Sequence, residues 1–207
     1  MMKGTSERIG MPTSGRGPIA DGLLFAGKFL RSPRTVGSIM PSSRQLARRM
    51  LAPIDWTTAT AVAELGAGTG VFTRMIRELK PPGCTALILE KDDGMRRQLA
   101  ARYPDLHVGG DARELTGIME RCGIERLDAV VCGLPFANFP QELRDAIMDQ
   151  VEAALRPGGV FVCFQYSLQM RKQLAARFGR VEIRFVPLNL PFAFVYVCRK
   201  RGNHDAG

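Results

Sequence analysis

Residues 64–72 read ELGAGTGVF and combine an acidic residue with three alternating glycines. Glycine allows the positive backbone torsions of a sharp turn and lets the backbone approach a ligand closely. Such a turn between a strand and a helix is typical of nucleotide sites at the carboxyl edge of a parallel sheet. A dinucleotide fingerprint requires G-x-G-x-x-G, and Val71 occupies the place of the third glycine. The pattern indicates a nucleotide-type ligand and disfavours pyrophosphate binding.

Further polar residues follow the next apolar runs. Glu90 comes directly after the run ALIL, where a carboxylate can accept hydrogen bonds from both hydroxyls of a ribose. Asp111 follows the third run, in VGGDARE, and the sequence GLPF follows the fourth, VVC. In a parallel sheet these positions meet at one edge, close to the glycine turn. Taken alone, Glu90 is equally compatible with a solvated strand end.

The elements that must position these residues are strands and helices in alternation. Seven strand-like runs follow from residue 60 onward, and helical stretches separate the first five. This pattern predicts a parallel sheet covered by helices on both faces. The last two runs, VEIRFVP and FAFVYVC, are joined by a short link and are expected to form an antiparallel hairpin at the edge. We therefore expect a Rossmann-like α/β fold with a seven-stranded, mostly parallel sheet and an antiparallel last strand.

Two helices carry clear sequence signals. Apolar residues spaced by four from Leu143 to Leu155 predict an amphipathic helix, which the PGG sequence at 157–159 would end. An earlier helix is expected to start at a cap formed by Ser42 or Ser43 and to run to about Leu51.

The glycine turn ELGAGTG resembles motif I of the class I S-adenosylmethionine-dependent methyltransferases. This resemblance implies that the acid after the second strand binds the ribose, that the acid after the third reads the adenine amino group, and that the loop after the fourth lies beside the reactive methyl. S-adenosylhomocysteine would be the product. The implied cofactor-binding residues are Glu64, Gly66, Ala67, Gly68, Gly70, Glu90, Lys91, Asp111, Ala112, Gly133, Leu134 and Pro135.

Most of the chain, from about residue 25 to 196, resembles the soluble bacterial phospholipid N-methyltransferases. The more specific segments are SIMPSSRQLARRM, GLPFANFP and NLPFAFVY, beside the more general LRPGG and FQYS. The resemblance implies methylation of phosphatidylethanolamine, through its methylated forms, to phosphatidylcholine. Phe192 departs from that family, which more often has a second proline there. Gly133 departs from the (D/N)-P-P-(Y/F) motif of base-amino methylation, which weakens that alternative.

The positive charge is concentrated at the N-terminal end. Residues 1–50 carry nine Lys or Arg and two Asp or Glu, which is +7 of the net +9. This asymmetry indicates an anionic partner, either lipid headgroups or nucleic acid, and a basic solvated face is the alternative. We expect disorder over 1–18, a basic amphipathic helical arm over 19–52 and the methyltransferase domain over 53–200. The residues predicted to contact an anionic phospholipid membrane are Leu24, Phe25, Lys28, Phe29, Arg31 and Arg34. The apolar part of the arm could instead pack on the sheet.

Methyl transfer to an amine requires alignment with the sulfonium methyl, exclusion of water and prior loss of the ammonium proton. Tyr166, in FQYS, is the predicted catalytic residue and would hold the lipid phosphate or the amine; an ordinary core aromatic is the alternative. Ser42, Ser43, Arg44 and Phe136 are predicted to contact the substrate, with Arg44 pairing with the lipid phosphate. The sequence identifies no general base, and water or the lipid phosphate could serve.

Other functional classes are constrained by what the sequence lacks. No run approaches the roughly 18 apolar residues of a membrane span, and the N-terminus has no signal-peptide pattern. Five scattered cysteines predict reduced core thiols rather than a metal site. We expect a cytoplasmic enzyme, peripherally associated with the inner face of the membrane. The alternatives are an rRNA adenine N6-methyltransferase-like enzyme, a methyltransferase for another small amine or lipid, and a catalytically silent module that retains the cofactor pocket. The rRNA enzyme is disfavoured because only about ten residues follow Tyr196, where such enzymes generally carry a helical RNA-binding domain.

Overall fold

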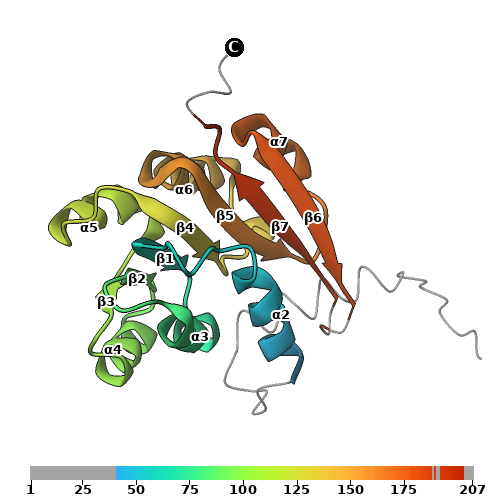
Figure 1. Ribbon diagram of the computed structural model, residues 1–207. Coiled ribbons are helices and arrows are strands. Elements are labelled where there is room, and N and C mark those ends of the chain that lie inside the picture. The colour runs from blue at the N-terminus through green and yellow to red at the C-terminus, as the bar shows by residue number, and fades with distance from the viewer. Residues whose placement is uncertain (1–40, 188, 190–191, 203–207) are drawn as a thin grey trace, which may run out of the picture.

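The computed structural model describes residues 41–187, 189 and 192–202. One seven-stranded sheet has the order β3-β2-β1-β4-β5-β7-β6 (Figure 1). Strands β1 to β5 run parallel, and β7 lies antiparallel between β5 and β6. This confirms the expected fold, including the antiparallel hairpin at the edge. The strands are β1 (Ala61–Leu65), β2 (Thr85–Leu89), β3 (His107–Gly109), β4 (Leu127–Cys132), β5 (Leu155–Gln165), β6 (Arg180–Val186) and β7 (Ala193–Arg199).

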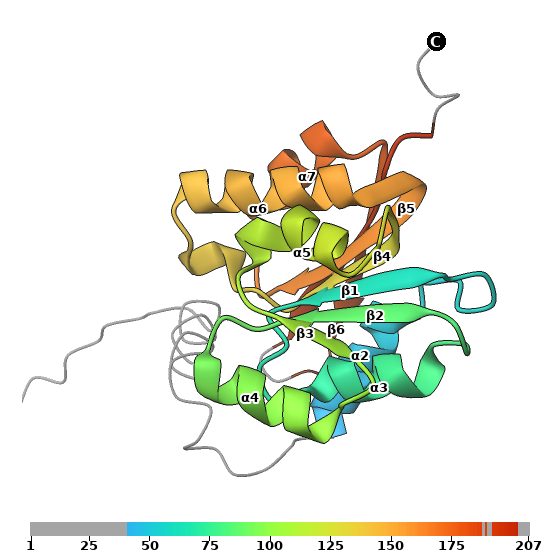
Figure 2. The same cartoon turned by 90° about the vertical axis from the view of Figure 1, so that its left-hand side faces the viewer.

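Helices cover both faces of the sheet, as Figure 2 shows. Apolar side chains from α2, α3 and α4 pack on one face, and those from α5, α6 and α7 pack on the other. The two apolar layers explain why the central strands read as continuous hydrophobic runs, since both of their faces are buried. The helices are α2 (Pro41–Leu51), α3 (Val71–Leu79), α4 (Asp93–Arg102), α5 (Leu115–Arg121), α6 (Gln141–Ala154) and α7 (Arg171–Arg177), with short 3₁₀ turns η2 (Ala112–Glu114) and η3 (Phe136–Asn138).

The strand register brings the predicted site loops to one edge. Leu65, the last residue of β1, is in register with Leu89 of β2 and with Cys132 of β4. The glycine turn, Glu90 and the GLPF loop therefore leave the sheet at the same level.

The predicted end of α6 is wrong. The helix ends at Ala154, and the PGG sequence lies inside β5. Here the Gly158 amide donates to the Lys200 carbonyl, and the Lys200 amide donates to the Gly159 carbonyl. These bonds hold the segment in the sheet, where the pairing of β4 with β5 shifts register.

The early helix ends at Leu51, as predicted, but it is already helical at Pro41. Ser42 and Ser43 thus lie within its first turn instead of capping it, and the structure does not describe their side chains. Residues 1–40, which include the six residues predicted to contact a membrane, also lie outside the described residues. All five cysteines are free thiols, and four of them are buried.

Candidate active site

The glycine turn connects β1 to α3 through three glycines with positive φ. The φ angles are 75° at Gly66, 55° at Gly68 and 82° at Gly70, a region that side chains rarely adopt. A Cβ at Gly66 would lie 2.6 Å from the Leu134 side chain, and one at Gly70 would lie 2.9 Å from that of Leu99. A Cβ at Gly68 would meet nothing within 4 Å. Packing thus requires the outer two glycines, whereas the middle one borders open space.

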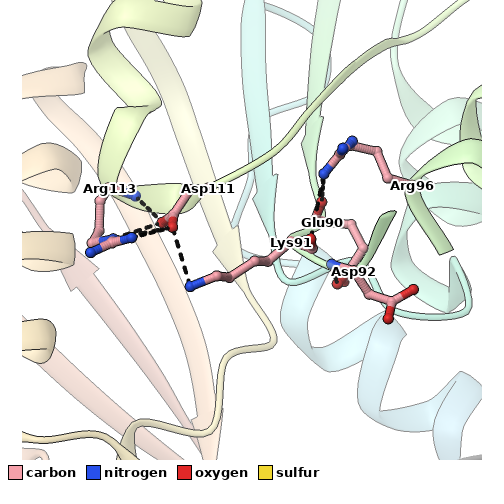
Figure 3. Close-up of polar contacts among 6 residues, drawn as sticks. All are labelled: Glu90, Lys91, Asp92, Arg96, Asp111 and Arg113. Atoms are coloured by element: carbon pink, nitrogen blue, oxygen red, sulfur yellow. Dashed lines mark hydrogen bonds and ion pairs between the residues drawn. The ribbon is translucent and has the colours of Figure 1, made fainter. Parts of the chain in front are cut away.

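Glu90 joins the end of β2 to this turn. Its Oε2 accepts a hydrogen bond from the Gly68 amide at 2.7 Å, and its Oε1 accepts one from the Asp92 amide at 2.8 Å. The guanidinium of Arg96 donates to the Glu90 carbonyl (Figure 3). A carboxylate has about four acceptor positions, so Glu90 retains acceptor capacity for a ligand.

Glu64, the acid before the turn, is fully buried beneath α3. Its Oε2 accepts from the Thr73 hydroxyl at 2.6 Å, while its Oε1 is buried without a hydrogen-bond partner among the described residues. Burial raises the pKa of Glu64 to about 7, and the Glu90 carboxylate contributes in the same direction. A buried acceptor of this kind suits a cationic or hydrogen-bonding ligand group.

Asp111 lies after β3 and caps the turn η2. Arg113 binds its carboxylate with Nη2–Oδ2 at 2.7 Å, and Lys91 approaches the same oxygen at 3.4 Å (Figure 3). The hydrogen bond from Arg113 is the main reason that the pKa of Asp111 is well below its ordinary value, so it is a fixed anion. Ala112, the next residue, is buried.

The GLPF loop packs directly on the glycine turn. The Gly133 amide donates to the Leu65 carbonyl at 2.8 Å, and a Cβ on Gly133 would lie 3.0 Å from the Gly66 carbonyl oxygen. Gln165, at the end of β5, donates from Nε2 to the Leu134 carbonyl at 3.1 Å. The ends of β1, β4 and β5 are thus joined by direct contacts. Pro135, next in the loop, is half-buried.

Tyr166 follows β5 and ends a row of aromatic rings that begins at the glycine turn. The ring centroids of Phe72 and Phe164 are 6.1 Å apart, and those of Phe164 and Tyr166 are 5.7 Å apart. Burial raises the pKa of Tyr166, although a hydrogen bond with Asn189 acts in the opposite direction. The phenol is therefore neutral at physiological pH and can donate or accept a hydrogen bond.

The structure separates the predicted substrate residues. Arg44 is exposed on α2. Phe136 is fully buried, packs edge-on against Phe139 at 6.0 Å and has the contacts of a core residue.

Comparison with known proteins decides the family. No family model matches the sequence. The ornithine lipid N-methyltransferase of Singulisphaera acidiphila is 38% identical over 184 residues, which is 86% of this chain and 96% of that protein. The chain belongs to the methyltransferase family of this relative. It is an S-adenosylmethionine-dependent methyltransferase, as the family membership and fold together indicate.

Two solved methyltransferase structures share the fold of this protein. The 1,6-didemethyltoxoflavin-N1-methyltransferase of Burkholderia thailandensis, with bound S-adenosylhomocysteine, has a TM-score of 0.63 at 18% identity, covering 92% of this chain and 93% of that one. An O-methyltransferase of Bacillus cereus, in complex with the same product, has a TM-score of 0.59 at 14% identity, covering 91% and 93%.

Several residues of this methyltransferase site were not predicted from the sequence. Thr73, Arg113, Gln165 and Asn189 each support a predicted residue by a hydrogen bond. Two of them had a signal, because Gln165 lies in the FQYS segment and Asn189 lies in the NLP segment of the hairpin link.

Neither a membrane span nor a metal site is found in the part of the chain that the structure describes. There, no helix combines the length and apolarity needed to cross a bilayer. Those same residues contain no group of three or more His, Cys, Asp or Glu side chains placed to hold a metal ion.

Proposed function

We propose that this protein transfers the methyl group of S-adenosylmethionine to the amine of a lipid headgroup at a membrane surface. The observation that carries the proposal is the 38% identity, over nearly the full length of the relative, to a protein named for methylation of ornithine lipid. The GLPF loop supports it, because Gly133 provides no side chain to hold a planar base amino group.

The proposed cofactor-binding residues would surround the ligand next to Gly68, where a Cβ would meet no other atom within 4 Å. Glu90 would bind the ribose hydroxyls, and Asp111 with the backbone of Ala112 would bind the adenine. Glu64 has a buried oxygen without a partner in the described structure, which fits the ammonium of the methionine part. The remaining members are Gly66, Ala67, Gly70, Lys91, Gly133, Leu134 and Pro135. When bound, the cofactor supplies a methyl group that its sulfonium already activates.

The work left to the protein is to position an amine and exclude water. A headgroup amine is protonated at neutral pH and must lose a proton before it can attack. Tyr166 has a raised pKa, so we assign it the role of orienting the amine through its hydroxyl oxygen, not of removing the proton. The aromatic row of Phe72, Phe164 and Tyr166 would exclude water from that side. Ser42, Ser43 and Arg44, and less directly the buried Phe136, remain proposed substrate residues.

The resemblance of the motifs favours phosphatidylethanolamine and its methylated forms as acceptors, while the relative's name favours an ornithine lipid. Both present an amine on a lipid, which is the shared chemistry that we propose. We further propose a cytoplasmic protein that docks on the inner face of the membrane through residues 19–52.

The deciding experiment follows methyl-labelled S-adenosylmethionine into purified acceptors. The full chain is incubated separately with phosphatidylethanolamine, its monomethyl form, ornithine lipid and ribosomal RNA, and Glu90→Ala serves as the inactive control. We expect label in one or more lipids and none in RNA. Label only in RNA, or in none of the acceptors while cofactor binding is intact, would refute the proposal.

A further inference from the structure

Exposed apolar side chains concentrate on one part of this protein. Among the described residues, the large apolar side chains with more than about a third of their surface exposed are Leu79, Leu168, Phe185 and Phe192. Leu79 ends α3. The other three belong to the β6–β7 hairpin or to the segment that leaves β5. Clustered exposed apolar groups mark interaction surfaces, whereas single ones are ordinary.

The two phenylalanines belong to a cluster of three rings. Phe185 pairs with Phe194 across β6 and β7, with ring centroids 5.5 Å apart. Phe192 lies 5.5 Å from Phe185 and 6.0 Å from Phe194. Phe185 is 56% exposed although it is central to these contacts. We call these three residues the phenylalanine cluster.

The sheet register places the phenylalanine cluster and the proposed acceptor site at the same edge of the sheet, on opposite faces. Phe194 is also in register with Gln165, the last residue of β5, directly before Tyr166. Asn189, the hydrogen-bond partner of Tyr166, lies in the link between Phe185 and Phe192. Side chains alternate along a strand, so Phe194 faces the layer of α5, α6 and α7 while Tyr166 packs with the opposite layer. The cluster and the site thus share the carboxyl edge of the sheet.

Basic residues accompany the apolar ones. The Tyr196 hydroxyl donates to the Ser167 carbonyl at 3.0 Å, which fixes the segment after β5 over β7 on the face of the phenylalanine cluster. That segment exposes Leu168 and leads to Arg171 and Lys172, both exposed and not part of an ion pair in the described structure. Arg171 interacts electrostatically with Tyr196, which lies two residues after Phe194 on the same face of β7. Exposed apolar rings and free cations on one face of a protein are the composition that binds an anionic bilayer interface.

We propose that the phenylalanine cluster inserts into an anionic phospholipid bilayer and orients the carboxyl edge of the sheet toward it. The inference rests on the proposed function, because a lipid acceptor would then enter beside the Tyr166–Asn189 pair. The neighbouring cations distinguish a bilayer from a second copy of the chain, since two identical basic surfaces would repel each other. The residues of this surface are different from those proposed for the basic N-terminal segment.

The test measures binding of the full chain to vesicles of phosphatidylcholine with increasing phosphatidylglycerol. The variant Phe185→Ser/Phe192→Ser is compared with wild type and with Leu79→Ser, a matched control in which a similarly exposed apolar residue outside the hairpin is changed. Each phenylalanine would bury apolar surface in the bilayer, so the double variant should bind at least about tenfold more weakly. Leu79→Ser should bind as wild type does.

Equal binding of wild type and the double variant would overturn the proposal. A wild-type dimer that the double variant abolishes would also overturn it, in favour of a second copy as the occupant. A second measurement covers the case in which the double variant fails to fold: Phe185→Trp in a Trp56→Phe background should shift its emission to shorter wavelength on vesicles, and no shift would refute insertion.

Methylation of a short-chain, monomeric lipid amine should be retained by Phe185→Ser/Phe192→Ser. If the wild type also failed to methylate this lipid amine, the result would contradict the proposed function and not the proposed membrane surface.

Discussion

Glu90 accepts a hydrogen bond from the Gly68 amide at 2.7 Å, so the end of β2 directly holds the middle of the glycine turn. The same carboxylate oxygen faces the part of the turn that borders open space. A residue assigned to the ribose therefore also sets the shape of the loop that would surround the cofactor.

Replacing Glu90 should weaken cofactor binding. Glu90→Ala loses the proposed ribose hydrogen bonds and frees the Gly68 amide, and we expect a loss of about 1.5–3 kcal/mol in the binding of S-adenosylmethionine. Isothermal titration calorimetry measures this loss directly. Asp93→Ala, which removes an exposed acid paired with Arg96 on α4, is the control and should leave the affinity unchanged. An unaltered affinity in Glu90→Ala would remove Glu90 from the site.

Gly68 and Gly83 form a matched pair for testing where the cofactor lies. Both have positive φ, at 55° and 86°, and a Cβ at either would meet no atom within 4 Å. Alanine at either position should therefore lower the free energy of unfolding by a similar amount, about 1 kcal/mol. Only Gly68→Ala should abolish detectable cofactor binding, because its methyl group would occupy the proposed cradle. Thermal unfolding with and without S-adenosylhomocysteine tests both effects, and equal ligand stabilisation of the two variants would contradict the assignment.

Glu64 should make the stability of the ligand-free protein depend on pH. Its pKa is raised from 4.5 to about 7, so the folded state binds more protons at Glu64 than the unfolded chain does between these values. This group therefore reduces stability as pH rises through that window, by an amount that reaches about 3 kcal/mol above pH 7. The difference in unfolding free energy between Glu64→Gln and wild type should favour the variant more at pH 8 than at pH 4.

The same carboxylate should couple proton release to cofactor binding. If the methionine ammonium pairs with Glu64, binding at pH 6 releases a proton, which calorimetry in buffers of different ionisation enthalpy detects. Glu64→Gln should lose both the proton release and part of the affinity. A pH profile of stability identical in wild type and Glu64→Gln would show that Glu64 does not titrate in this range.

Tyr166→Phe should separate catalysis from cofactor binding. The substitution keeps the ring contact with Phe164 at 5.7 Å and removes only the hydroxyl that bonds with Asn189. We expect kcat to fall about tenfold, which corresponds to about 1.4 kcal/mol, with no change in affinity for S-adenosylmethionine. Steady-state kinetics with a lipid acceptor distinguishes this from a loss of lipid binding, which would raise KM alone. An unchanged kcat would leave Tyr166 as a packing residue.

The basic arm should contribute to membrane binding in a salt-dependent manner. In the sequence, Lys28, Arg31 and Arg34 lie within or just after the apolar stretch of the proposed arm, and replacing all three by Gln should remove about 3 kcal/mol of attraction to anionic vesicles. Added salt should weaken binding of the wild type more than that of the variant, because surface charges are screened within about 10 Å at 0.1 M. Co-sedimentation at several fractions of anionic lipid measures this, and equal binding at every fraction would identify the arm as a solvated face or an RNA contact.

Sequence patterns predicted the sheet and the positions of the site loops well, because both depend on local periodicity. Alternating apolar runs and helices define a parallel sheet, and a turn of alternating glycines follows directly from the backbone torsions it needs. The partners of the site residues were not predictable in this way. Thr73 reaches Glu64 only because α3 packs over β1, and Asn189 reaches Tyr166 only because β7 inserts between β5 and β6.

The error at the PGG sequence has the same physical origin. Pro and Gly after an amphipathic stretch usually end a helix, so the local sequence predicts a helix end there. The hydrogen bonds between this segment and Lys200 come from the far end of the chain. No local pattern contains them.

The order of the strands separates the residues proposed to bind the cofactor from those proposed to bind the acceptor. The residues assigned to the cofactor all lie between 64 and 135, at or after the ends of strands β1 to β4, whereas Tyr166, Asn189 and the phenylalanine cluster all follow β5. We therefore expect that substitutions or insertions after residue 165 change which amine is accepted and leave the glycine turn, proposed to hold the methyl donor, undisturbed.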